Sequence, residues 1–392
     1  MLKINDDIYY IGAINPTLRV FDIIMKTEYG TTYNAYLIKD VKNVLIETVH
    51  EKFFDEYLES IEEIIPIEKI DYLILNHTEP DHTGSVRKLL EKNPNITIIT
   101  TMAGKNFVSN ICNMDFSSQV VKDGDILNIG SRSLEFIVAP LLHWPDSMFT
   151  YSKSDKILFS CDFLGTHYAE PKIFDKYVKY PEKYEESLLY YFNAIFGPFK
   201  PNVLYGLSRI ENLDLSTICP SHGPILQETF PHVINQYKTW ASEIKLPNKK
   251  VTIFYVSAYG YTKKLANFAK EFLEKNGITV EIFNVIHSDI SEIISSIHSS
   301  DGILVGSPTI NRDALKPVWD VLSSIDAISN KGKLCGVFGS YGWSGEAVPM
   351  IKQRLESLKL KVLDDGVKVL FNPNKDDMIK MEEYINKFVQ MI

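Results

Sequence analysis

Residues 70–85, IDYLILNHTEPDHTGS, decide how the rest of the chain is interpreted. Five of the six positions 70–75 are apolar, which predicts a buried strand. Four side chains of metal-binding type follow directly: His77, Glu79, Asp81 and His82. In an extended segment, alternation would place His77, Glu79 and Asp81 on one side, with a helix opening at residues 83–85. So many potential ligands at one strand end predict a metal site.

Composition describes an ordinary globular protein of more than one domain. The chain has 392 residues, 45% of them hydrophobic and 23% charged, and this length favours two domains. The formal charge of −9 disfavours nucleic acid and anionic membranes as partners. The N-terminus lacks an apolar leader, and no apolar run reaches membrane-spanning length. Four cysteines without a CxxC motif fit reduced thiols, so we expect a cytoplasmic protein.

The first part of the chain mixes short strands with a few helices. Turn residues and alternation predict strands at residues 8–11, 33–38, 44–47 and 96–100. A hairpin is expected to pair residues 120–129 with residues 134–139. Helical spacing marks residues 53–65, 85–91, 178–196 and 232–244, and a short linker is expected at residues 246–250.

Three later positions supply further candidate ligands. His143 follows the predicted strand 134–139, Asp162 follows an apolar run at residues 156–160, and His222 lies in a turn after another apolar stretch. Taken singly, each is as well explained as a loop or turn residue. His167 comes soon after Asp162, where it could act as an outer hydrogen-bond partner of a metal ligand.

The first motif resembles the HxHxDH motif of metallo-β-lactamases, with Glu79 in place of the second histidine. The form HxExDH is found in flavodiiron proteins, and a carboxylate-rich N/O ligand set suits iron. This resemblance implies an αββα sandwich with two iron ions. One iron would be bound by His77, Glu79 and His143, and the other by Asp81, His82 and His222. Asp162 would bridge the two.

At residue 251 the pattern changes to alternating strands and helices. Residues 251–256, 279–283, 302–305, 333–338 and 361–363 predict a doubly wound, five-stranded parallel sheet. Ligands of such sheets bind beyond the carboxyl ends of the strands. We therefore predict domains at residues 1–248 and 249–392.

The loops after three of these strands resemble those of flavodoxins, which implies bound FMN. The first loop leads into a helix, whose N-terminus suits a phosphate. It comprises Ser257, Ala258, Tyr259, Gly260, Tyr261 and Thr262. The isoalloxazine ring would lie on the other two loops. These comprise Ser307, Pro308, Thr309, Ile310 and Asn311, and Ser340, Tyr341, Gly342, Trp343, Ser344 and Gly345.

The resemblance covers both domains and implies an oxidoreductase that reduces dioxygen to water or nitric oxide to nitrous oxide. The expected electron donor is a separate partner, rubredoxin or a reduced deazaflavin, because no rubredoxin-like CxxC pair follows Ile392. A head-to-tail homodimer, or a dimer of such dimers, is also expected. Two alternatives remain: a zinc hydrolase of the metallo-β-lactamase fold joined to a regulatory flavodoxin, and an electron carrier with a structural metal.

Overall fold

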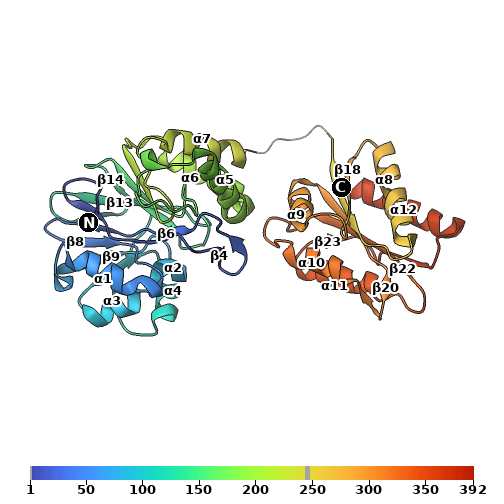
Figure 1. The fold of residues 1–392 in the computed structure, drawn as a ribbon, viewed down its shortest axis with the longest axis horizontal. Coiled ribbons are helices and arrows are strands. Elements are labelled where there is room, and N and C mark those ends of the chain that lie inside the picture. The colour runs from blue at the N-terminus through green and yellow to red at the C-terminus, as the bar shows by residue number, and fades with distance from the viewer. Residues whose placement is uncertain (1, 243–247) are drawn as a thin grey trace. The chain divides into compact units, whose positions relative to one another are not determined.

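The computed structural model describes residues 2–242 and 248–392. The chain divides into two compact units, Met1–Glu243 and Ile244–Ile392, which are treated separately below (Figure 1). Part of the predicted linker at residues 246–250 lies outside the described residues. No helix in the described parts is both long enough and apolar enough to cross a membrane.

A seven-stranded mixed sheet forms one half of the first unit. Its order is β1-β2-β7-β8-β9-β10-β11, antiparallel as far as β8 and parallel from β8 onward. The strands are β1 (Leu2–Lys3), β2 (Ile8–Tyr10), β7 (Tyr36–Ile38), β8 (Asn43–Ile46), β9 (Ile70–Ile74), β10 (Thr97–Thr100) and β11 (Ser117–Val120). Along β9, Leu73 packs toward the helices and Ile74 toward the second sheet, as the two-residue period of a strand requires.

The second sheet has the order β12-β13-β14-β15-β16, and only its last pair is parallel. Its strands are β12 (Ile126–Asn128), β13 (Ser133–Val138), β14 (Met148–Ser152), β15 (Ile157–Cys161) and β16 (Thr217–Pro220). A core that includes Ile46, Ile99, Phe136 and Phe159 fills the space between the sheets.

Helices cover the outer face of each sheet, which completes the predicted αββα sandwich (Figure 1). The first sheet is covered by α1 (Phe54–Glu62), α3 (Val86–Lys92) and α4 (Met102–Cys112). The second is covered by α5 (Pro181–Tyr191), α6 (Lys200–Ile210) and α7 (Phe230–Ala241). Helices α4 and α6 are absent from the sequence-based expectations.

The structure corrects two predictions around the ligand motif. Residues 77–81 are not one extended segment, because the short helix α2 (Pro80–Thr83) begins at Pro80. Proline is favoured at the first helical position, where its missing N–H is not needed. The predicted strand 33–38 is also interrupted, since β6 (Thr31–Tyr33) pairs with β3 (Ala13–Asn15) and β7 belongs to the large sheet.

The interruption places Asn34 against the turn that carries His222. The Asn34 backbone N–H donates to the Ser221 carbonyl at 2.8 Å. Its side-chain amide donates to the carbonyls of Pro220 at 2.8 Å and Gly223 at 2.9 Å. These hydrogen bonds stabilise the interruption of the strand at Asn34, because buried carbonyl groups need hydrogen-bond partners.

The predicted hairpin is present between β12 and β13 but is shorter than expected. Val120 belongs instead to β11, which pairs with β10 in the other sheet. A further antiparallel pair, β4 (Val20–Phe21) and β5 (Met25–Lys26), forms a separate hairpin. The single strand predicted at residues 120–129 is therefore two strands, β11 and β12, which belong to different sheets.

The second unit is the predicted doubly wound parallel sheet. Its order is β18-β17-β19-β22-β23, with β24 also paired to β22, so it has six strands rather than five. The long strand β22 is edged by two short strands, β23 at its beginning and β24 at its end. The strands are β17 (Lys250–Tyr255), β18 (Thr279–Asn284), β19 (Gly302–Gly306), β22 (Leu334–Tyr341), β23 (Lys361–Val362) and β24 (Val367–Leu370).

Helices lie on both faces of this sheet, each over its own apolar core (Figure 1). One face is covered by α8 (Tyr261–Lys275) and α12 (Lys375–Met391), and the other by α9 (Ile290–Ser299), α10 (Lys316–Ser324) and α11 (Ala347–Ser357). A small hairpin of β20 (Thr309–Ile310) and β21 (Asp313–Ala314) follows β19.

We predict that Asn34→Ala lowers the free energy of unfolding of the first unit by about 1–3 kcal/mol, because the buried carbonyls of Pro220 and Gly223 each lose one hydrogen bond. Denaturant titration of the full chain measures this change. Asn110→Ala is the control, since that exposed side chain bonds only to its own helix and should change stability by less than about 0.5 kcal/mol. Equal effects of the two substitutions would contradict the role given to Asn34.

Candidate metal centre and phosphate-binding loops

The seven candidate ligands selected from the sequence come together in the first unit. They lie at or just beyond the ends of β9, β13, β15 and β16, and in α2. Glu79 directly precedes α2 as its N-cap residue, so the helix turns the following side chains back toward the strand ends. The residues are His77, Glu79, Asp81, His82, His143, Asp162 and His222.

The first ligand group consists of His77, Glu79, His143 and Asp162. Oε2 of Glu79 lies 3.0 Å from Nε2 of His143 and 3.2 Å from Nε2 of His77. Oδ2 of Asp162 lies 3.3 Å and 3.7 Å from the same two nitrogens. Such separations leave two imidazoles and two carboxylates converging on one point.

The second group consists of Asp81, His82 and His222. Oδ2 of Asp81 lies 3.0 Å from Nε2 of His222, and its Oδ1 lies 3.4 Å from Nε2 of His82. Oδ1 of Asp162 approaches the same histidines at 3.5 Å and 3.1 Å. Asp162 therefore faces one group with each of its oxygens.

Several of the donor atoms lack hydrogen-bond partners within the described parts of the protein, and divalent cations would satisfy them. Both carboxylate oxygens of Asp81, Nε2 of His82 and Oδ1 of Asp162 are buried, and none makes a hydrogen bond to the described residues. Unpartnered buried polar atoms are costly, and metal coordination would satisfy them. The set also combines nitrogen and oxygen donors, as iron and manganese sites do.

Electrostatics in the cluster hold the carboxylates ionised. Burial alone would raise the pKa of Asp162, but His82 and the neighbouring imidazoles hold that pKa well below its usual value. Burial alone would lower the pKa of His82, but Asp81 and Asp162 raise it to about 10. The buried acids thus require positive charge, which protons or metal ions supply.

Outer partners fix the orientation of a histidine in each group. Nδ1 of His77 donates to Oδ2 of Asp146 at 3.4 Å, and Nδ1 of His222 donates to the Thr32 carbonyl at 2.6 Å. Asp146 is itself held by the backbone N–H and the hydroxyl of Thr78, each at 2.8 Å. With Nδ1 engaged, Nε2 of each ring is directed to the candidate metal position.

Aromatic rings pack around the second group. His167 is buried, and its ring centroid lies 4.8 Å from that of His222, 4.4 Å from Phe21 and 4.9 Å from Tyr191. Its Nδ1 shares a 2.8 Å hydrogen bond with the Thr31 hydroxyl. His167 therefore lies beside a candidate ligand without joining either ligand group.

Several residues near the centre were not selected from the sequence. Tyr191 falls in the predicted helix 178–196, and Asp146 lies three positions after His143 in the same loop. Glu47 directly follows β8, as Asp162 follows β15, and burial raises the pKa of Glu47 to about 7.

Asp22 lies in the β4–β5 turn, where burial and the nearby Glu79 raise its pKa to about 6. That turn also holds Asp22 and Ile23 at positive φ, which is rare for isoleucine.

The three loops expected to hold FMN follow β17, β19 and β22, at the carboxyl edge of the sheet. Gly260, with φ +84°, precedes α8, and no side chain caps the helix N-terminus. The buried Ser257 hydroxyl has no partner among the described residues. Free backbone N–H groups and an unengaged hydroxyl suit a phosphate.

The first and third loops are joined by a hydrogen bond of 2.9 Å between the hydroxyls of Thr262 and Ser340. Trp343 is 99% exposed and Tyr259 is 82% exposed, so neither is a core residue. Flat, exposed rings beside a phosphate cradle fit the stacking of an isoalloxazine. The residues present therefore fit FMN.

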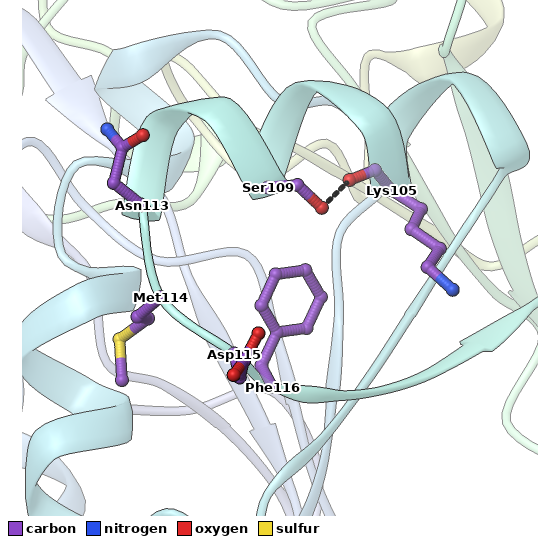
Figure 2. A pocket seen from close by; sticks show the side chains of 6 residues that line it. All are labelled: Lys105, Ser109, Asn113, Met114, Asp115 and Phe116. Atoms are coloured by element: carbon purple, nitrogen blue, oxygen red, sulfur yellow. Dashed lines mark hydrogen bonds between the residues drawn. The ribbon is translucent and has the colours of Figure 1, made fainter.

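A surface hollow of about 520 Å³ lies elsewhere on the first unit, between the end of α4 and the segment before β11 (Figure 2). It shares no residue with the ligand cluster. Its lining residues are Lys105, Ser109, Asn113, Met114, Asp115 and Phe116. Without a converging set of donors, it offers no comparable chemistry.

These features define a class of protein: an αββα metal-binding unit joined to a flavodoxin-like unit. Family models agree, since residues 31–223 match the ODP family beta lactamase and residues 253–384 match flavodoxin. The chain is 48% identical to the flavo-diiron protein FprA2 of Clostridium acetobutylicum, over 100% of this chain and 99% of that one. It is 35% identical to the nitric oxide reductase of Moorella thermoacetica, over 100% and 98%.

A solved structure, the rubredoxin oxygen:oxidoreductase of Desulfovibrio gigas, matches with a TM-score of 0.75 and 31% identity. The match covers 99% of this chain and 98% of that one. The chain belongs to the flavodiiron family of oxidoreductases. As the family name states, its members combine a flavin with a pair of iron ions.

We predict that Asp146→Asn weakens metal binding at the first ligand group by about 10–100-fold, because the ring of His77 loses its charged partner. Titration of the metal-free chain with ferrous ion under anaerobic conditions measures this affinity. Thr78→Val is the matched control, since it removes one hydroxyl contact to Asp146 and leaves the carboxylate in place. Unchanged affinity in Asp146→Asn would show that Asp146 does not orient His77.

Proposed function

We propose that this chain is a flavodiiron oxidoreductase that reduces dioxygen to water or nitric oxide to nitrous oxide. The observation that carries the proposal is the placement of Asp162, whose two oxygens face two separate ligand groups. The relatives named nitric oxide reductase and rubredoxin oxygen:oxidoreductase support both substrates.

In this proposal, one iron would be bound by His77, Glu79 and His143, the other would be bound by Asp81, His82 and His222, and Asp162 would bridge them. The metal unit covers residues 1–248 and the FMN unit covers residues 249–392. FMN would lie on residues 257–262, 307–311 and 340–345, with its phosphate on the first of these loops. Bound FMN and iron together supply the electron transfer and the polarisation of the substrate's oxygen atoms.

The chain's own residues hold and shield this chemistry. Asp146 and the Thr32 carbonyl orient the rings of His77 and His222. The rings of Phe21, His167 and Tyr191 pack against His222 of the second group and shield it from solvent. Burial raises the pKa of Tyr191 well above its usual value, so its hydroxyl stays protonated and remains a hydrogen-bond donor.

We also propose a cytoplasmic protein that receives electrons from a separate donor, rubredoxin or a reduced deazaflavin. The name of the rubredoxin oxygen:oxidoreductase supports the first donor. Anaerobic reduction with each donor in turn, followed by absorption of the flavin, distinguishes them.

The deciding experiment mixes the anaerobically reduced chain with dioxygen and with nitric oxide separately in a stopped-flow instrument. We expect rapid reoxidation of the flavin by at least one gas. Asp162→Ala should lose both irons, or leave two uncoupled ions, and reoxidise slowly. The control is Asp214→Ala, an exposed carboxylate outside the cluster. A full, magnetically coupled iron pair in Asp162→Ala would refute the ligand assignment.

For the flavin, we predict that Ser257→Ala weakens FMN binding more than riboflavin binding. Only FMN carries the phosphate that the free Ser257 hydroxyl would contact, and hydrogen bonds to an anion are strong. Equilibrium titration with fluorescence detection compares the two flavins. Ser357→Ala, whose hydroxyl bonds to the end of α11, serves as the control. Equal weakening of both flavins would place the phosphate elsewhere.

We further propose a head-to-tail homodimer in which the flavin of one chain serves the iron of the other. Electron transfer needs the two centres nearly in contact, and a two-fold dimer uses each contact patch twice. Exposed Trp343 in the third flavin loop and exposed Ile23 in the turn near the metal centre are suited to such contact. The double substitution Trp343→Ala and Ile23→Ala should raise the dissociation constant of the dimer.

A complementation experiment tests this arrangement. An iron-deficient Asp81→Asn chain is mixed with a flavin-deficient chain carrying Ser257→Ala and Thr262→Val, under conditions that exchange subunits. In a mixed dimer, the intact flavin of one chain should serve the intact iron pair of the other, and gas reduction should return. Mixed dimers that form and stay inactive would show that electrons move within one chain.

A further inference from the structure

A third cluster of metal-binding side chains involves a cysteine that the iron proposal does not use. Cys161 is the last residue of β15 and is 2% exposed. Ligand atoms of His82, Cys161 and Asp162 all lie within 4.8 Å of one another. Donors grouped this closely can converge on one metal ion, whose usual coordination distances are about 2.0–2.3 Å.

The irregular end of β15 accompanies this placement of Cys161. The pairing of β15 with β16 shifts between Phe159 and Cys161. Cys161 also adopts a left-handed backbone conformation with φ +54°. Non-glycine residues rarely adopt this conformation, and their strain is often found at functional sites.

The partners of Cys161 in the cluster have buried polar atoms without hydrogen bonds in the part of the chain that the structure describes. Nε2 of His82 and Oδ1 of Asp162 lie 3.1 Å apart, and neither makes a hydrogen bond to the described residues. A second carboxylate, Glu47, is also buried in the first unit. Oε2 of Glu47 likewise has no hydrogen-bond partner among the described residues.

The chemical character of this trio differs from that of the two iron groups. Sulfur with one imidazole and one carboxylate suits a thiophilic divalent ion, whereas the nitrogen and oxygen groups suit iron. We propose that His82, Cys161 and Asp162 form a binding site for a thiophilic divalent cation, zinc or cadmium. Binding transfers the thiol proton to solvent and leaves the thiolate on the metal.

The site has a consequence for iron loading, because it shares two residues with the proposed iron pair. Because His82 and Asp162 belong to both sets of ligands, a thiophilic ion here competes with iron at the second position. Iron at the first group, with His77, Glu79 and His143, does not need Cys161. A chain exposed to excess zinc or cadmium should therefore hold one such ion and lose one of its two irons.

The test uses the full-length chain, stripped of metal by a chelator under anaerobic, reducing conditions, with cadmium chloride as the probe. We expect one cadmium per chain with an ultraviolet thiolate-to-cadmium absorption band. Cys161→Ser should lose the band and bind cadmium at least about tenfold more weakly, since a direct donor matters no less than an outer partner. Cys219→Ser is the matched control, because that buried thiol lies in the adjacent strand β16 and outside the trio.

An unchanged band in Cys161→Ser, or equal loss in Cys219→Ser, would overturn the proposal. Cadmium NMR of the wild-type chain gives a check that needs no variant: a shift typical of oxygen and nitrogen ligands alone would overturn it as well. Two irons bound beside one cadmium would refute the shared site. The cadmium measurements need neither flavin nor gas turnover, so their failure leaves the proposed oxidoreductase activity to its own test.

Discussion

The metal-binding site of the first unit depends on one buried carboxylate, which lies between the two ligand groups. Asp162 is 2% exposed, and its two oxygens face different ligand groups. A carboxylate in this position is costly unless positive charge and hydrogen-bond donors surround it. The carboxyl ends of β9, β15 and β16 meet there, and each delivers at least one of the surrounding residues. The two sheets must therefore pack so that these strand ends lie together and surround the charge of Asp162.

Local patterns were sufficient to predict the parts of the protein that short segments determine. The motif at residues 77–82 follows β9 directly, so its ligands share one strand end whatever the rest of the chain does. The alternation of strands and helices after residue 250 likewise determines a parallel sheet, and the loops after β17, β19 and β22 must then lie at its carboxyl edge. Exposed Trp343 follows from its glycine neighbours in one of these loops.

Contacts between distant segments could not be predicted in this way. Periodicity shows which face of an element is buried, but it does not identify the partner. Tyr191 has the spacing of an ordinary packing residue, yet the fold brings its ring 4.9 Å from that of His167. Asn34 ends a strand only because the turn at residues 220–223 needs its amide. Cys161 directly precedes Asp162 in the sequence, but only the fold brings it close to His82. Glu47 likewise comes within electrostatic range of His82 only in the fold.

The same long-range contacts make the two ligand groups unequal. His77 is backed by the charged carboxylate of Asp146, whereas His222 is backed by the neutral carbonyl of Thr32. A carboxylate behind an imidazole makes that ring a stronger donor than a carbonyl does. Glu79 and His143 are also more exposed than the remaining ligands, each with 14% of its side chain accessible. The first group is thus partly accessible to solvent and has a charged carboxylate behind His77, while the second is enclosed by Phe21, His167 and Tyr191. Two ions of one element held here would differ in affinity and in access, and this difference is built into the chain before any metal binds.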